Sequence, residues 1–79
     1  MIYYITKCMY MAWASNGGLK RTKVIFYRAY KRLAYAQKAF EKYKPRALNN
    51  DNITLWLYKV DTSETDEDGF YKNELIAEI

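Results

Sequence analysis

The sequence predicts a small α+β fold, in which one amphipathic helix covers a mainly antiparallel sheet of three or four strands as a two-layer sandwich. Three observations predict it. The 79 residues limit the chain to one domain, residues 1–79, with a thin core, since a chain of this size buries only roughly 60% of its unfolded surface. β-branched and aromatic residues crowd both ends of the chain, and one central stretch has the helical period.

The N-terminal part predicts a β-hairpin. Residues 2–13 are rich in Tyr, Ile and Met and lack helix caps, which favours a strand. Ser15-Asn16-Gly17-Gly18 is typical of a tight turn, because Asn and Gly accept positive φ values. Residues 22–28 then form the returning strand. The following Lys20 and Arg21 lack the spacing of a phosphate-binding P-loop, so turn chemistry alone explains this segment.

The central segment predicts the helix. At about 100° per residue, an apolar face opposes a basic one. The apolar face comprises Phe26, Ala29, Tyr30, Leu33, Ala36, Gln37 and Phe40. Pro45 disfavours helical geometry at Lys44, so we expect the helix to end there. Its start is open, from Thr22 to Ala29, because the segment before it is also rich in β-forming residues, and the element order is therefore ββαββ or βαββ.

The C-terminal part predicts a second hairpin. After an Asn-rich loop at residues 49–52, the alternation over residues 53–60 places Leu55 and Leu57 on one face and Trp56 and Tyr58 on the other. A polar loop at 61–69 leads to a last strand at 70–79. A single helix covers one sheet face, so we expect Trp56 and Tyr58 to face solvent and to bind a partner protein or a second copy.

Composition predicts a cytoplasmic protein. Cys8 is the only cysteine, whereas a secreted domain of this length normally needs several disulfides. The longest uncharged apolar run, residues 8–14, is too short to cross a bilayer, and no signal peptide is evident, so no membrane association is expected. Charge is divided along the chain: residues 1–46 hold 11 basic residues and one acidic residue, and residues 47–79 hold two basic and eight acidic residues.

The available side chains argue against catalysis. The chain has no histidine, the usual general base near neutral pH. Cys8 lies within a predicted strand without a base partner and is interpreted as a buried apolar residue. We therefore expect no enzyme activity and no cofactor.

An acidic loop invites a calcium interpretation, which fails in detail. Its carboxylates are Glu64, Asp66, Glu67 and Asp68. Aligning Glu64 with the first position of an EF-hand loop places Leu75 where a bidentate Glu belongs, and strands flank the loop. We expect no metal here, and a solvated loop that can contact a basic groove on a partner.

The basic helix face is the strongest candidate for binding. The residues concerned are Arg28, Lys31, Arg32, Tyr35, Lys38 and Lys42. Such a stripe can follow the phosphates of a nucleic acid or another polyanion, or contact an acidic protein surface, including the acidic loop of a second copy. Basic helix faces also serve only for solubility, and the sequence leaves these alternatives open.

The overall build, with the strand Ile2-Tyr3-Tyr4-Ile5, one helix and a closing hairpin at 53–60 and 70–79, is similar to that of small phage-encoded accessory proteins, including anti-CRISPR and other anti-defence inhibitors. The resemblance implies stoichiometric inhibition, in which the protein binds a host defence or nucleic-acid-processing protein by surface complementarity. This is the leading expectation from the sequence. The alternatives are a small nucleic-acid-binding module and capture of a small anionic ligand in an oligomer cleft.

Overall fold

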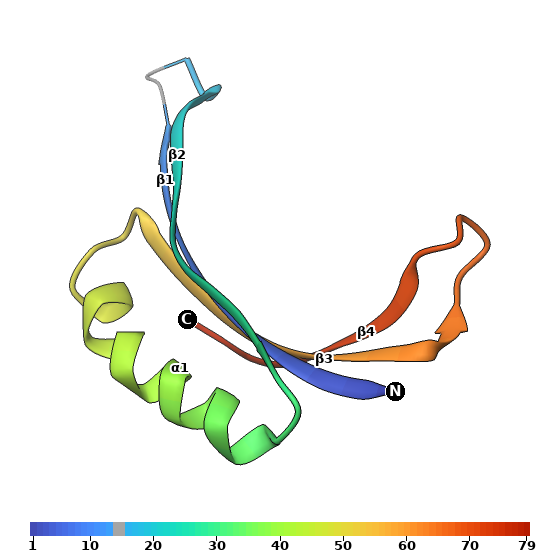
Figure 1. Ribbon diagram of the computed structural model, residues 1–79. Helices are drawn as coiled ribbons and strands as arrows, with labels where there is room; N and C mark the ends of the chain where they lie inside the picture. The colour runs from blue at the N-terminus through green and yellow to red at the C-terminus, as the bar shows by residue number, and fades with distance from the viewer. Residues whose placement is uncertain (14–15) are drawn as a thin grey trace.

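Four strands and one helix make up the fold, and the computed structural model describes residues 1–13 and 16–79 (Figure 1). The elements are β1 (Ile2–Trp13), β2 (Leu19–Tyr30), α1 (Leu33–Leu48), β3 (Ile53–Thr65) and β4 (Tyr71–Glu78). The strands form one antiparallel sheet in the order β2-β1-β3-β4. The predicted α+β class, with one helix on an antiparallel sheet, is confirmed.

The first hairpin joins β1 to β2. Gly17 has a φ of 85°, which only glycine adopts without strain, and the N–H of Gly18 donates to Asn16 Oδ1 at 3.0 Å. Ser15, part of the predicted turn, lies outside the described residues. β2 extends past the predicted 22–28 at both ends.

The predicted start of the helix is wrong. α1 begins at Leu33, not between Thr22 and Ala29, because the β-branched and aromatic residues before it pair with β1 as far as Tyr30. Phe26, Ala29 and Tyr30, predicted on the apolar helix face, therefore belong to β2, and the βαββ alternative is wrong.

The predicted end of the helix is also wrong, since Pro45 lies inside α1, which continues to Leu48. Asn49 N–H donates to the Pro45 carbonyl oxygen at 3.1 Å, and Ala47 is buried in the core. Packing of this last turn outweighs the preference of Lys44 for extended geometry.

The core lies between α1 and the middle of the sheet. Cys8, Leu55 and Leu57 from β1 and β3 pack against Ala36 and Phe40 of the helix. Thr6, which is fully buried, donates from Oγ1 to the Ala36 carbonyl oxygen at 2.7 Å. The predicted face of β3 that carries Leu55 and Leu57 is thus confirmed as the helix-facing one.

The second hairpin is longer than predicted. β3 continues to Thr65, so the polar loop expected at 61–69 is reduced to a short turn. Asp66 Oδ1 accepts hydrogen bonds from the backbone N–H groups of Asp68 and Phe70, at 2.9 and 3.0 Å, and Gly69 has a φ of 83°. These contacts close the turn into β4.

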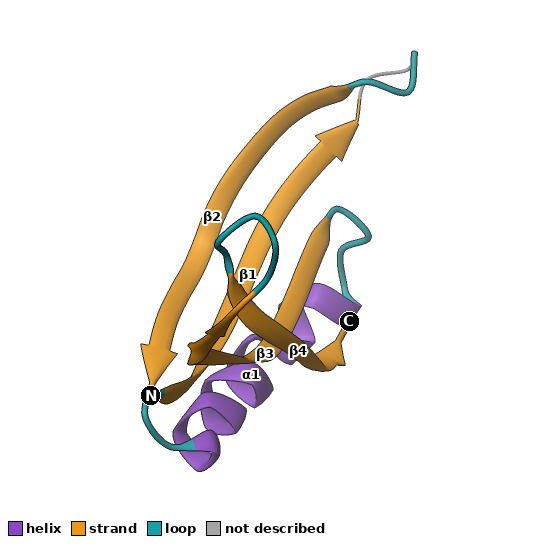
Figure 2. Cartoon of the chain, turned by 90° about the vertical axis from the view of Figure 1, so that its right-hand side faces the viewer, coloured by secondary structure: helices purple, strands orange, loops and turns teal. Residues whose placement is uncertain are grey.

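The sheet is strongly curved, and the two hairpins extend past the helix as separate arms (Figures 1 and 2). We call them the β1–β2 arm and the β3–β4 arm. The chain measures 42 × 31 × 16 Å along its principal axes. Since α1 packs on the middle of one face only, both arms stay uncovered and the structure departs from a complete two-layer sandwich. Among the described residues, no helix is long and apolar enough to span a membrane.

Candidate functional site

A groove lies between β2 and the exposed side of α1, and we call it the β2–α1 groove. Its volume is about 450 Å³. It is lined by Phe26, Arg28, Tyr30, Tyr35, Lys38, Ala39, Lys42 and Tyr43. The groove exists because α1 packs mainly on β1 and β3 and makes few contacts with β2, the edge strand. Side chains from the strand and the helix therefore meet across an open space.

Local geometry places three cations in this groove. Arg28 and Tyr30 are two residues apart on β2, so they share one face of the strand. Lys38 and Lys42 are four residues apart on α1, so they lie on one side of the helix, and Tyr35 lies one turn before Lys38. No acidic residue lines the groove.

Aromatic rings contact two of the three cations of the groove, Arg28 and Lys42. Phe26 and Tyr43 stack with ring centroids 4.7 Å apart. Lys42 Nζ lies 5.7 Å from the Tyr43 ring centroid, and Arg28 Cζ lies 5.5 Å from that of Tyr30. These contacts position the positive charges above ring faces, so the groove offers flat aromatic surfaces and cations side by side.

The positive charge of the groove is not neutralised by the described acidic side chains. Glu41, the acidic residue of α1, pairs with Lys44 at 3.9 Å, and Lys72 pairs with Glu64 at 3.3 Å on the other arm. Both pairs are exposed and contribute little to stability. Neither involves Arg28, Lys38 or Lys42, so the groove attracts anions.

The structure brings part of the predicted basic stripe together. Tyr35, Lys38 and Lys42 lie together as expected, and Arg28 joins them from β2 rather than from the helix. Lys31 and Arg32 lie outside the groove, exposed in the turn before α1, because the helix begins later than predicted.

Sequence reasoning missed Tyr30 and Tyr43 as site residues. The sequence predicts Tyr30 on the apolar helix face, whereas the extension of β2 places it in the groove. Tyr43 lies four residues after Ala39, about one helical turn, and this spacing was the signal that could have identified it.

The second candidate surface is the sheet face opposite α1, which we call the open face. In the register, Lys7 lies between Tyr27 of β2 and Trp56 of β3, with Nζ 5.9 and 5.7 Å from their ring centroids. Ile5 and Val60 are each only 4% exposed, although no helix covers them. The surrounding aromatic rings therefore form a small core of their own.

Trp56 and Tyr58 lie on the open face, as predicted, but they are half-buried rather than left to solvent. Burial, and then the neighbouring Tyr27 and Tyr3, together raise the pKa of Tyr58 to about 12. Tyr58 thus packs among aromatic neighbours within its own chain.

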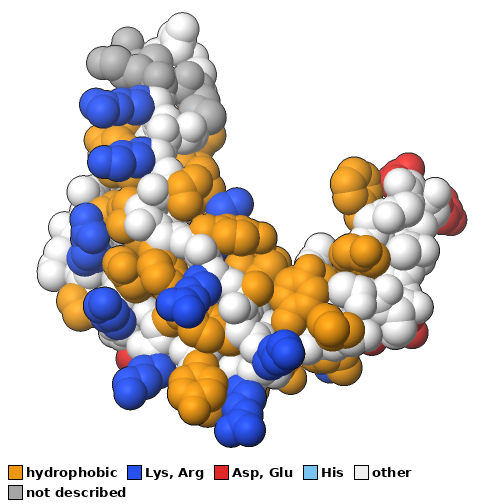
Figure 3. Space-filling view, viewed as in Figure 1, with side chains coloured by type: hydrophobic (Ala, Val, Ile, Leu, Met, Phe, Trp, Pro, Cys, Tyr) orange, Lys and Arg blue, Asp and Glu red, His pale blue; other side chains and the backbone are white. Residues whose placement is uncertain are grey.

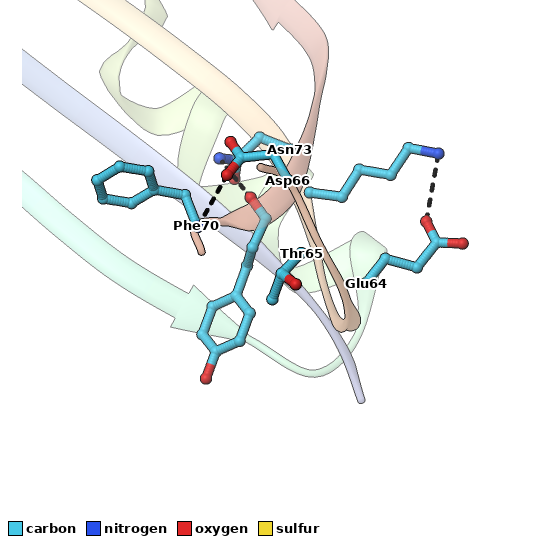
Figure 4. A pocket seen from close by; sticks show the side chains of 7 residues that line it. Glu64, Thr65, Asp66, Phe70 and Asn73 are labelled. Atoms are coloured by element: carbon cyan, nitrogen blue, oxygen red, sulfur yellow. Dashed lines mark hydrogen bonds and ion pairs between the residues drawn. The ribbon is translucent and has the colours of Figure 1, made fainter. Parts of the chain in front are cut away.

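The carboxylates of the acidic loop point in different directions and do not gather at one place. Glu64 points toward Lys72 and away from Asp66, whose carboxylate accepts backbone hydrogen bonds (Figure 4). Glu67 and Asp68 are exposed in the turn. Across residues 1–13 and 16–79, no three carboxylate or thiol side chains converge as metal ligands do.

Cys8 is fully buried, and burial raises the pKa of its thiol, an effect that the charge of Arg46 only partly offsets. A thiol in this state is a poor nucleophile.

Comparison with known protein families, with curated proteins and with solved structures finds no match for this chain. The resemblance to phage anti-defence inhibitors therefore stays a prediction.

Proposed function

We propose that this protein binds single-stranded nucleic acid in the β2–α1 groove. The observation that carries the proposal is the convergence of Arg28, Lys38 and Lys42 with exposed and half-buried tyrosines, in a groove that no acidic side chain lines. The two kinds of side chain match the two parts of a nucleotide.

The cations match the phosphates. Lys38 and Lys42 are exposed on one side of α1, and Arg28 faces them from β2, so a phosphate backbone running between strand and helix meets positive charge on both sides. Arginine also donates two parallel hydrogen bonds to one phosphate. Release of counterions from the phosphates then contributes much of the binding free energy.

The aromatic rings match unpaired bases. Tyr35 is 55% exposed at the mouth of the groove, and Tyr30 and Tyr43 line its walls. Stacking of a base on such a ring contributes about 1–3 kcal/mol and requires a base that is not already stacked in a duplex. As a ligand of these rings, a single strand is therefore favoured over a duplex. It is also favoured over an acidic protein surface, which offers carboxylates but no bases to stack.

Fluorescence anisotropy with a labelled single-stranded oligonucleotide at about 50 mM salt tests the proposal. Lys38→Glu places a negative charge in the groove, and we expect it to weaken binding more than tenfold, since about 1.4 kcal/mol corresponds to a factor of ten. Lys72→Glu, on the β3–β4 arm, is the matched control because it changes the net charge by the same amount outside the groove.

Tyr35→Ala provides the second readout. It leaves the charge of the groove unchanged and removes an exposed ring, so we expect weaker binding to single strands without a matching loss for a simple polyanion such as heparin. Equal binding by the Lys38→Glu and Lys72→Glu variants, or no binding by the unmodified protein, would rule out this function.

A further inference from the structure

The β2–α1 groove is closed at one end and open at the other. β2 ends at Tyr30 and α1 begins at Leu33, so the residues between them join the two walls of the groove and close that end. At the other end α1 stops at Leu48, whereas β2 reaches back into the β1–β2 arm (Figure 1). A ligand longer than the groove therefore leaves it toward this arm.

A second hollow follows the groove in this direction, and its volume is about 410 Å³. Its lining includes Tyr10, Lys23, Ile25, Arg46 and Asn50. It adjoins the groove along both walls, because Ile25 precedes Phe26 on β2 and Arg46 follows Lys42 by about one turn of α1. Among the described residues, no acidic side chain lines it. The two hollows thus lie in succession along the same strand and the same helix.

Cations continue along β2 beyond the groove. The register pairs Lys23 with Tyr10 and Arg21 with Ala12. Tyr10 and Ala12 lie two and four residues after the buried Cys8, so they continue the helix-facing side of β1. Lys23 and Arg21 therefore lie on the helix side of the β1–β2 arm, and both are exposed.

The groove and its continuation carry cations on both walls. On α1 they are Lys38, Lys42 and Arg46, spaced by four residues, and on β2 they are Arg28, Lys23 and Arg21. Figure 3 shows Lys and Arg side chains over the β1–β2 arm and over the helix, and acidic side chains at the end of the other arm. The ion pairs of the described residues involve none of these six cations.

We propose that a single strand bound in the β2–α1 groove continues over the second hollow and along the helix side of the β1–β2 arm. This course rests on the proposed function, and it sets the length of strand that the protein covers. At about 3.3 Å per residue, β2 advances about 13 Å from Tyr30 to Phe26 and about 30 Å from Tyr30 to Arg21. Since successive phosphates of one strand advance about 3.4 Å, the groove alone takes about four nucleotides and the whole course about nine.

The second hollow matches a nucleotide in the same way as the groove does. Tyr10, which is half-buried there, offers a further ring to an unpaired base, beside the cations of Lys23 and Arg46. Arg46 also lies in the last turn of α1, where the helix dipole favours a cation. That role does not apply to Lys23 and Arg21, which lie on a strand. An acidic peptide matches the cations but leaves Tyr10 without a stacking partner.

The salt dependence of strands of different length tests this course. Fluorescence anisotropy is measured with labelled single strands of about four and about ten nucleotides, at four or more salt concentrations. For the shorter strand, three phosphate contacts give a slope of about −2, and for the longer strand six contacts give about −4. Raising the salt from about 50 to about 200 mM then weakens binding about 16-fold for the shorter strand and about 250-fold for the longer one.

Removing the cations outside the groove should abolish this difference. In the variant Arg21→Gln with Lys23→Gln and Arg46→Gln, we expect the slope for the longer strand to fall to about −2. Binding of the shorter strand should stay unchanged, which also shows that the variant is folded.

Lys31→Gln with Arg32→Gln and Lys72→Gln is the matched control. It removes the same charge from exposed positions outside the course, two of them at the closed end of the groove, and the slope for the longer strand should stay about −4.

The outcomes separate this course from the groove itself. Equal slopes for the two strands in the unmodified protein would show that the strand does not reach the arm, and a loss of slope in the control variant alone would show that it leaves over the closed end. A glutamate peptide of about ten residues that displaces the longer strand as well as an unlabelled copy does would assign the course to acidic protein segments. Each of these results overturns the proposed course, whereas no binding of either strand would refute the groove as well.

Discussion

Salt dependence gives the most quantitative test of the β2–α1 groove. Three cations, Arg28, Lys38 and Lys42, line it. If each neutralises one phosphate of a single strand, the logarithm of the affinity falls with the logarithm of the salt concentration with a slope of about −0.7 per contact, hence about −2 in total. Raising the salt from about 50 to about 200 mM then weakens binding about 16-fold.

Removing one contact changes that slope by a defined amount. In Lys42→Gln two phosphate contacts remain, so the slope becomes about −1.4 and the same salt increase weakens binding about sevenfold. Anisotropy titrations of one labelled oligonucleotide at four or more salt concentrations measure both slopes. A slope near zero for the unmodified protein, or the same slope for Lys42→Gln, would show that these side chains do not contact phosphates.

Three further predictions concern the fold that supports the site. Thr6→Val keeps the buried volume but removes the hydrogen bond to the Ala36 carbonyl oxygen, so we expect a loss of about 1 kcal/mol and a Tm lower by about 4–8 °C; an unchanged melting curve would refute this. The Cys8 thiol should react with a disulfide reagent only at the rate of unfolding, and fast labelling of the native protein would contradict its burial. Tyr58 should be among the last tyrosines to ionise in a spectrophotometric titration, near its pKa of about 12, with Tyr58→Phe identifying its signal. Because that pKa lies above the unfolded value, stability from this group is present below about pH 10 and is lost as the pH rises toward 12; unchanged denaturant midpoints across that interval would contradict it.

Local sequence signals predicted the paired strands well and the helix limits poorly. The strand at residues 2–13 is correct because β-forming residues are concentrated there. The alternation of β3 is correct because Leu55 and Leu57 are buried on its helix-facing side and Trp56 lies on the other. Residues 26–30 fit a helical period equally well, and only pairing with β1 across the turn decided in favour of a strand. Such tertiary contacts produce no pattern in the local sequence.

The candidate groove was visible in the sequence only as a charge pattern. Lys38, Lys42 and Tyr35 share a side of one helix, so spacing predicted their proximity. Arg28 comes from a different element, and its position opposite them depends on how α1 lies on the sheet. A groove between two elements is a property of their packing angle, which periodicity does not encode.

The uncovered sheet face was predicted for the right reason but with the wrong degree of exposure. One helix does leave one face open, yet Trp56 and Tyr58 are half-buried instead of exposed. Large aromatic side chains that pack together remove apolar area from water. This packing stabilises a short chain, whose core is thin.

The single helix accounts for both candidate surfaces. Because α1 lies over the two central strands, the edge strand β2 stays free on the helix side, and long basic side chains from both elements can meet there without crowding the core. On the opposite side no helix packs, and the sheet is curved (Figure 1). The two surfaces are separated by the thickness of the sheet.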